Sequence, residues 1–340
     1  MSVSTDEIVS LKAADISEED GLLFAIQMDG NGGGRVEGWD HIRKWKGTHG
    51  PLWVHVDAGS PHVRDWLVEE SGLTTVTIDA LLDPAARPRV FSGKNGYITI
   101  LRGVNLNEGA EREDMVALRL WSDGDRVITL RHDYLRTPRI LLDSLLVGQG
   151  PKSAAALYEG LIDRLIDFFG VAIEEYEGRI DDLEVSVADD PDIDDLRREL
   201  TLLRQELAQV RRYMAPQRHA LQRLLDFPPA WLADQQLLLL RESVDQFEHY
   251  VEELDEYRER ALVVKDDIQN LMDEKMNRNM YILSIVAAVF LPLGFLTGLL
   301  GINVGGMPGV ESGDAFWLTC IVLGIILVGE VALFRRLGWL

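Results

Sequence analysis

The first part of the chain shows the alternation of apolar and polar residues that is typical of β-strands. Short apolar runs are divided by Gly, Asn, Asp and Pro from about residue 21 to residue 133. The expected strands are Leu22–Met28, Leu52–Val56, Arg89–Phe91, Tyr97–Val104, Met115–Trp121 and Val127–Arg131. Short helices are expected over Pro61–Ser71 and Val76–Leu82. Residues 1–150 are therefore predicted to form a mixed α/β domain.

Beyond Tyr134 apolar residues recur every three or four positions, which indicates helices. Ala154–Val187 and Ile193–Leu225 are separated by Pro191 and predict an antiparallel helical hairpin within residues 151–228. After Pro229 no proline occurs before Pro292. Residues 229–280 are therefore expected to form a stalk helix that continues into the following apolar segment.

The stalk carries an apolar stripe with heptad-like spacing, formed by Val244, Phe247, Val251, Leu254, Ala261, Ile268 and Met272. Such a stripe packs either against other helices of the same chain or against other copies of it. Because the helix is longer than a domain and leads into an apolar segment, we favour self-association.

Two segments, residues 281–300 and 315–334, have the length and composition of membrane spans. About 20 apolar residues cross about 30 Å of hydrocarbon. The charged residues between positions 281 and 334 are Glu311, Asp314 and Glu330. We expect two transmembrane helices joined by a loop at 301–314 and followed by a tail at 335–340. Glu330 is expected either to extend to the membrane interface or to pair there with Arg335 or Arg336.

One face of the first span is built mainly from small or polar residues: Asn277, Met280, Ser284, Ala287, Leu291, Gly294, Gly298 and Gly301. Small residues on a membrane helix allow close helix packing. They also suit the wall of a pore, and the spacing leaves both explanations open. Since one hairpin cannot enclose a path for ions, transport would require several copies of the chain.

The charged residues and the single cysteine indicate which partners and sites to exclude and how the chain is oriented in a membrane. The net charge of −22 argues against nucleic acid as a partner, and the single Cys320 allows neither an intramolecular disulfide nor a Cys-based zinc site. The acidic N-terminus is not expected to be a signal peptide. Lys275, Arg278, Arg335 and Arg336 flank the spans, whereas the loop has no basic residue. Both termini are therefore predicted to be cytoplasmic.

The loop sequence resembles the signature of the CorA superfamily of divalent-cation transporters. Gly301-Ile302-Asn303 stands where magnesium members have Gly-Met-Asn, and the following Val304-Gly305-Gly306-Met307-Pro308-Gly309 is similar to the zinc-transporting, ZntB-type branch. Phe290-Leu291-Pro292, the segment from Arg211 to Arg218 and the terminal Trp339-Leu340 extend the resemblance over essentially the whole chain.

The resemblance implies a homopentamer in the bacterial inner membrane, with an α+β cytoplasmic funnel domain, a long stalk helix and a two-helix transmembrane hairpin. Gly301, Ile302 and Asn303 would form the selectivity entrance, with Asn303 contacting a hydrated metal ion. Glu311 and Asp314 would attract cations to the loop. The path below would be lined by Asn277, Met280, Leu283, Ala287, Leu291, Gly294 and Gly298; the family places Leu283 where the stripe places Ser284.

The transported ion is not readable from the residues. Zinc prefers nitrogen and sulfur ligands, but the seven histidines are scattered through the first 250 residues without pairing. Transport of Zn²⁺ and its coupling to protons rest on the resemblance. A magnesium or broad divalent-cation channel is the first alternative, and a membrane-anchored scaffold or sensor is the second. We expect neither an enzyme nor a cofactor.

Overall fold

The computed structural model describes residues 18–188, 192–302, 309 and 312–338. The chain divides into two compact units, Met1–Lys265 and Asp266–Leu340. The first unit holds a sheet and the helices around it, and the second holds two long apolar helices.

The first unit is built on a seven-stranded mixed sheet with the order β2-β1-β3-β7-β6-β5-β4. Its neighbours are antiparallel except for β3 and β7, which run parallel at the centre with His55 opposite Thr129. The strands are β1 (Leu22–Met28), β2 (Gly34–Glu37), β3 (Leu52–Asp57), β4 (Arg89–Ser92), β5 (Tyr97–Gly103), β6 (Val116–Ser122) and β7 (Arg126–Arg131).

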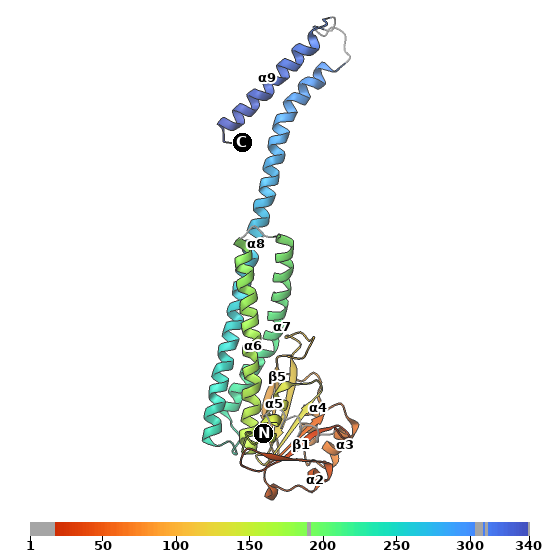
Figure 1. Cartoon of the computed structure of the whole chain (residues 1–340), viewed down its shortest axis with the longest axis vertical. Helices are drawn as coiled ribbons and strands as arrows, with labels where there is room; N and C mark the ends of the chain where they lie inside the picture. The colour runs from red at the N-terminus through yellow and green to blue at the C-terminus, as the bar shows by residue number, and fades with distance from the viewer. Residues whose placement is uncertain (1–17, 189–191, 303–308, 310–311, 339–340) are drawn as a thin grey trace, which may run out of the picture. The chain divides into compact units, whose positions relative to one another are not determined.

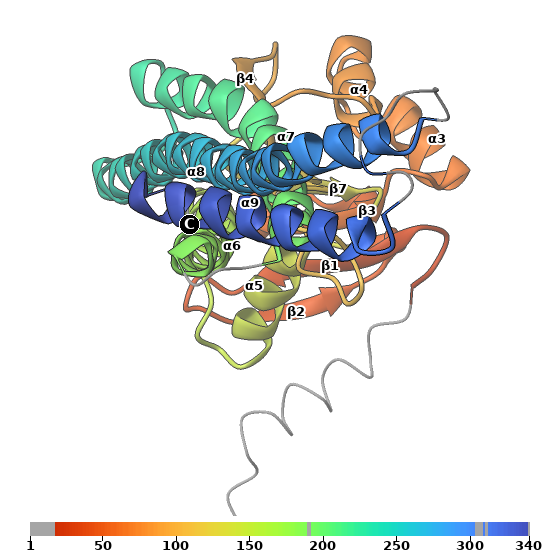
Figure 2. The same ribbon diagram turned by 90° about the horizontal axis from the view of Figure 1, so that it is seen from above.

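Helices cover both faces of this sheet, so the central strands are apolar on both sides. One face packs on α2 (Trp39–Lys44), α3 (Pro61–Glu69) and α4 (Thr75–Leu82), through a core that includes Trp66, Leu81 and Ile100. A short 3₁₀ helix, η1 (Gly47–His49), precedes β3. Figures 1 and 2 show α3 and α4 on the side of the sheet opposite α5 (Arg136–Leu146).

Three long helices form a bundle beside the sheet: α6 (Ala154–Ala188), α7 (Ile193–Asp226) and the first half of α8 (Asp234–Leu300). The rings of Phe169 on α6 and Phe247 on α8 meet edge to face at 5.1 Å. Val244, Val251, Leu254 and Ala261 of the stalk stripe are buried as well. The single chain therefore covers this part of the stripe, and the prediction that it serves self-association is wrong.

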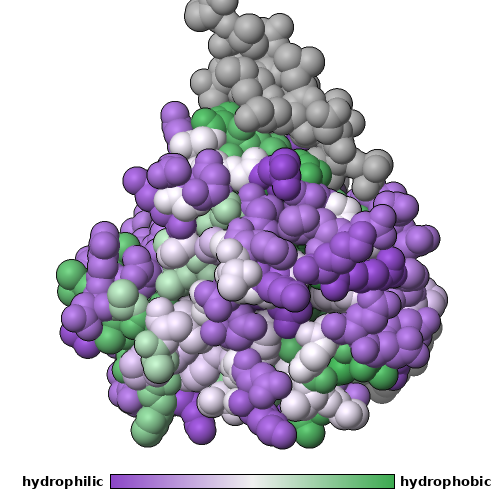
Figure 3. Space-filling model, turned by 90° about the horizontal axis from the view of Figure 1, so that it is seen from below, coloured by the Kyte–Doolittle hydropathy of each residue, from purple (hydrophilic) through white to green (hydrophobic). Residues whose placement is uncertain are grey.

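The surface of the first unit is strongly polar. Figure 3, which views the end that carries the sheet, shows hydrophilic residues over most of that face, with hydrophobic residues in separate small groups. This distribution is ordinary for a water-exposed domain. It contrasts with the second unit, in which large hydrophobic side chains are exposed along both helices.

The second unit contains the end of α8 and the helix α9 (Ala315–Arg336). Both helices are long and apolar enough to cross a membrane, and the apolar segment of each helix is not buried inside the chain. Leu300 ends α8 and Ala315 begins α9, so the two apolar helices are consecutive. Lipid or other protein chains must cover such surfaces, because water would leave them highly unfavourable.

Candidate ion-conducting site

The predicted path residues lie on one continuous helix. Helix α8 carries the stripe from Asn277 to Gly298 without interruption. All seven predicted path residues are exposed in the single chain, with Leu283 at 69% and Leu291 at 70%. The chain therefore places these side chains along one helix and leaves that side uncovered.

The opposite side of the same helix is partly buried. Its half-buried positions include Ile285, Val289, Leu293 and Leu296. At 3.6 residues per turn this stripe stands about half a turn from the predicted path stripe. Helix α9 has a matching half-buried stripe of Ala315, Thr319, Leu323, Ile326 and Glu330. Figures 1 and 2 both show α9 alongside the end of α8, which accounts for a half-buried stripe on each helix.

The glycines of the path stripe are not used for packing within the chain. A Cβ atom placed on Gly294 or Gly298 would meet no atom within 4 Å. Close helix packing through small residues would instead bring a neighbouring backbone to this distance. Of the two explanations for the stripe, close packing between α8 and α9 is therefore absent from the described hairpin.

The polar side chains of the span bond to its own backbone. Ser284 Oγ donates to Met280 O at 2.8 Å, and Thr297 Oγ1 donates to Leu293 O at 3.0 Å and lies 3.1 Å from Gly294 O. Internal bonds of this kind satisfy hydroxyl groups in a bilayer without external partners. Ser284 thus lies on the exposed stripe, but its hydroxyl hydrogen is already engaged.

The predicted entrance lies at the C-terminal end of α8. Gly301 donates its N–H to Thr297 O at 3.0 Å, and Gly301 and Ile302 are exposed. The carbonyl groups of a final helical turn carry partial negative charge, which favours cations nearby. Asp314 is exposed and caps α9 without a side-chain hydrogen bond. Asn303 and Glu311 lie outside the described residues.

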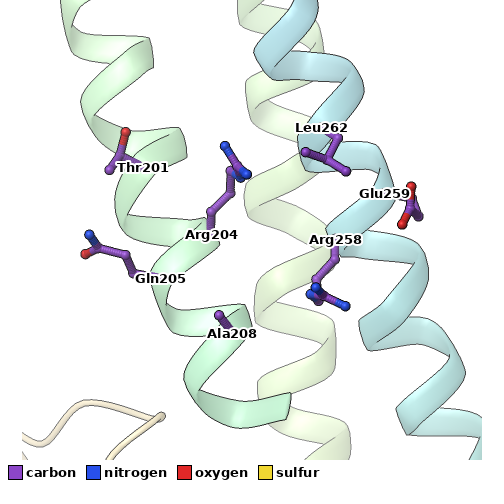
Figure 4. A pocket seen from close by; sticks show the side chains of 7 residues that line it. All are labelled: Thr201, Arg204, Gln205, Ala208, Arg258, Glu259 and Leu262. Atoms are coloured by element: carbon purple, nitrogen blue, oxygen red, sulfur yellow. The ribbon is translucent and has the colours of Figure 1, made fainter. Parts of the chain in front are cut away.

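A hollow between α7 and α8 in the first unit does not suit a cation. Figure 4 shows Arg204 and Arg258 among its lining residues, together with Glu259 and Leu262. Two guanidinium groups repel divalent cations. Within residues 18–188, 192–302, 309 and 312–338, no group of three or more His, Cys, Asp or Glu residues could hold a metal ion.

Of the two expectations for Glu330, the pairing with Arg335 or Arg336 is not found among the described residues. No ion pair of Glu330 occurs within the part of the chain that the structure describes, and its Oε2 atom is buried without a hydrogen-bond partner. The side chain points along the half-buried stripe of α9, whereas Arg335 and Arg336 are exposed on another side of the helix. Sequence spacing alone did not reveal this difference in direction.

Comparisons with known proteins agree with this architecture. The model of the family described as CorA-like Mg²⁺ transporter protein matches residues 49–336. The chain is 37% identical over 332 residues to the divalent cation transporter CmaX of Pseudomonas aeruginosa, covering 97% of this chain and 100% of the relative. It is 31% identical over 341 residues to the zinc transport protein ZntB of Yersinia pseudotuberculosis, covering 98% and 100% respectively.

A solved structure of full-length CmaX superimposes with a TM-score of 0.81 at 38% identity, covering 95% of this chain and 99% of that one. The predicted fold class is thereby confirmed: an α+β domain, a long helix and two apolar C-terminal helices. The expectations of a transporter without enzymatic activity or cofactor are confirmed by the family. The chain belongs to the CorA-like Mg²⁺ transporter family and is a membrane protein that transports divalent cations.

Proposed function

We propose that this chain takes up Zn²⁺ through the central pore of a homopentamer and that an inward proton gradient drives the uptake. One observation supports the assignment of this stripe of α8 to the wall of the pore. The stripe that includes Ala287, Leu291, Gly294 and Gly298 is uncovered in the single chain and lies about half a turn from the face that meets α9. Several copies arranged around an axis would place these stripes around a common lumen.

The lumen residues suit passage better than tight binding. The glycine and alanine positions keep the path wide, and Met280 and Leu291 offer no charge that would hold a divalent ion. Conduction requires sites that an ion can leave as readily as it enters. The exposed side-chain amide of Asn277 offers a neutral oxygen at the opposite end of the stripe from Gly301.

Cation selection is proposed to occur at Gly301, Ile302 and Asn303. Five Asn303 side-chain carbonyls around the axis would contact a hydrated ion without removing its water, which is costly for small divalent cations. The C-terminal end of α8 adds partial negative charge at the same place. Glu311 and Asp314 would raise the local cation concentration through their field.

The positions of the basic residues indicate how the chain is oriented in the membrane. Lys275 and Arg278 precede the first span, and Arg335 and Arg336 follow the second, whereas the loop at 301–314 contains no basic residue. Basic residues remain on the cytoplasmic side of a bilayer. We therefore place the α/β domain and both termini in the cytoplasm of a bacterial cell and the loop outside its inner membrane.

Zinc is the proposed ion because the loop continues as Val304-Gly305-Gly306-Met307 and a zinc transport protein is similar over 98% of the chain. A broader divalent-cation specificity is the second candidate. It is favoured by the higher identity to a protein named only as a divalent cation transporter and by the magnesium in the family description.

The test is metal uptake into proteoliposomes of the purified full-length chain. Zinc and magnesium are compared with and without an inward proton gradient. The proposal predicts zinc uptake that rises with the gradient. Magnesium uptake that is indifferent to the gradient would replace it with the second candidate, and absence of flux for both ions would leave a membrane-anchored scaffold.

The entrance is tested separately with Asn303→Ala, measured beside Ser312→Ala of the same loop. Ser312 is exposed and lies outside the signature. We expect Asn303→Ala to abolish uptake while the number of subunits, measured by mass spectrometry in detergent, stays at five. Unchanged flux in Asn303→Ala would remove the entrance assignment.

A further inference from the structure

A second polar hollow lies in the α/β domain, outside the proposed ion path. Its volume is about 190 Å³, and it lies between the sheet and the first turns of α5. His55 of β3 and Arg131 of β7 line it at the carboxyl ends of the two parallel strands. This end of a parallel strand pair is a common place for ligands in α/β folds. The other lining residues are Glu18, Leu23, Phe24, Tyr134, Leu135, Pro138, Arg139 and Leu142.

Thr129 holds one side of the His55 ring, which lines the hollow. The residue is 4% exposed, and its Nδ1 lies 2.8 Å from Thr129 Oγ1. That oxygen also accepts the indole N–H of Trp53 at 2.9 Å, while its distance to Val54 O is 3.5 Å. Thr129 Oγ1 thus holds the Nδ1 side of the ring, and which of the two atoms donates depends on the tautomer of His55.

The buried His55 ring is neutral near pH 7. Burial, reinforced by the nearby Arg131, lowers the pKa of His55 to about 3. A hydrogen bond with the Thr129 backbone opposes this shift without reversing it. His55 therefore presents a neutral imidazole to the hollow, and its position is fixed by Thr129.

Two arginines supply positive charge to the same space. The Arg131 guanidinium lies 5.7 Å from the centre of the Tyr134 ring, and its Nη2 is 3.4 Å from Glu18 Oε1. The Nε atom of Arg139 lies 3.0 Å from Asp143 Oδ1, a carboxylate on the next turn of α5. Among the described lining residues Glu18 is the single acidic one, and its contact of 3.4 Å with Arg131 leaves that guanidinium able to bind another anion.

The N-terminus of α5 adds a second, independent feature. Its cap residue Leu135 makes no side-chain hydrogen bond, and the first turn contains no acidic residue. The N–H groups at the start of a helix are free of intrahelical partners and favour negative charge; in α5 these are the N–H groups of Arg136 and Thr137, because Pro138 has none. Leu135, Pro138 and Arg139 all line the hollow, so this end of the helix adjoins it.

We propose that this hollow binds a small organic oxyanion, a carboxylate or a phosphate monoester. Its charged head lies between Arg131, Arg139 and the ring of His55, and its short apolar body lies on Phe24 and Leu142. The hollow is smaller than the several hundred Å³ of typical drug-sized sites, which excludes nucleotides. Guanidinium groups bind both carboxylate and phosphate in a bidentate manner.

Calorimetric titration of the full-length protein in detergent tests the site. The probes are inorganic phosphate, propyl phosphate and butyrate, each against chloride at equal ionic strength. We expect propyl phosphate or butyrate to bind more tightly than inorganic phosphate, because the floor of the hollow is apolar. Tighter binding of propyl phosphate assigns the phosphate class, and tighter binding of butyrate assigns the carboxylate class.

Three variants locate the binding. Arg131→Gln and Arg139→Gln are expected to weaken it at least about tenfold, the effect of losing one charge-assisted bond. Glu18→Gln removes the competing carboxylate and is expected to tighten it. Arg204→Gln, in the hollow between α7 and α8, is the matched control and should leave it unchanged. Binding that is insensitive to Arg131→Gln and Arg139→Gln, or absence of binding for all probes, would overturn the proposal, whatever the outcome of the uptake experiments.

Discussion

Arg211 of α7 and Asp255 of α8 form a bidentate ion pair: Arg211 Nε donates to Asp255 Oδ1 at 2.5 Å, and Arg211 Nη2 lies 3.3 Å from Asp255 Oδ2. The Arg211 guanidinium lowers the pKa of Asp255 below its ordinary value, so the carboxylate stays charged in all physiological conditions. Both side chains are 42% exposed, so water screens much of the attraction. The pair fixes the relative rotation of two helices more than it adds stability.

The other two helix pairs of the bundle are joined in the same way. Arg179 of α6 pairs with Glu206 of α7, and Arg260 of α8 donates to Asp181 and Glu184 of α6. Every pair among α6, α7 and the first half of α8 is therefore bridged by one arginine. Such directed contacts restrict the rotation of a helix that continues into the membrane segment.

Removing the arginine of α8 is expected to loosen the bundle. Arg260 is 26% exposed and engages two carboxylates, so Arg260→Gln should lower the free energy of unfolding by about 1 kcal/mol. This corresponds to a fall of about 1–2 °C in the midpoint of thermal unfolding, given the length of the chain. Arg198→Gln is the control, because Arg198 and its partner Asp195 are 71% and 69% exposed and should contribute almost nothing. Equal shifts for both variants would contradict the account.

Glu159 of α6 predicts a dependence of stability on pH. Burial, with a further contribution from Asp163, raises the pKa of Glu159 to about 7. Asp163 itself accepts a hydrogen bond from Ser243 of α8 at 2.7 Å. Because the folded form holds its proton more tightly than the unfolded chain, this group lowers stability as pH rises from about 4.5 to about 7.

Glu159→Gln should therefore stabilise the protein at pH 8, by about 1 kcal/mol after allowance for partial exposure, and change little at pH 4.5. Thermal unfolding at the two pH values measures the difference. Glu252→Gln, at an exposed position of α8, is the matched control and should not alter the pH profile. A Glu159→Gln variant with the wild-type pH dependence would show that burial does not govern this group.

Filling the uncovered face of α8 is expected to block transport. Gly298 and Gly324 both have open space where a side chain would begin, but Gly298 lies on α8 and Gly324 on α9. Leucine at either position adds the same volume within a membrane helix. Gly298→Leu should reduce divalent-cation uptake at least about tenfold, whereas Gly324→Leu should leave it within about twofold. Equal loss in both variants would indicate damage to the hairpin instead of a narrowed path.

Most of the sheet could be predicted from alternation. The strand at Leu22–Met28 was predicted with the observed bounds, and the strand beginning at Leu52 is one residue longer than expected. Strand β2 was missed because Gly34–Glu37 contains a single apolar residue and pairs at the edge of the sheet. Helix α5 was missed because Pro138, which a first turn tolerates, resembles a helix breaker in sequence.

Periodicity could not reveal which surface covers an apolar stripe. The heptad-like spacing of Val244 and Phe247 fits both a partner chain and α6, and only the fold shows that Phe169 fills the contact. Spacing identified the stripe of small residues on the first span. It could not show that Gly294 is uncovered, because this depends on which face of α8 is turned toward α9. The pocket of His55, Arg131 and Arg139 had no sequence signal, since its residues come from two strands and a helix that are distant in the chain.

The most direct test of the central claim is a scan of single cysteines along the first span in a Cys320→Ser background. Each variant is reconstituted, and uptake is measured before and after a water-soluble thiol reagent that cannot cross lipid. We expect inhibition at 287, 291, 294 and 298 and none at 285, 289, 293 and 296, because the first set lies on the uncovered face. Inhibition at the second set, or at neither, would show that this face of α8 does not line the path of the ion.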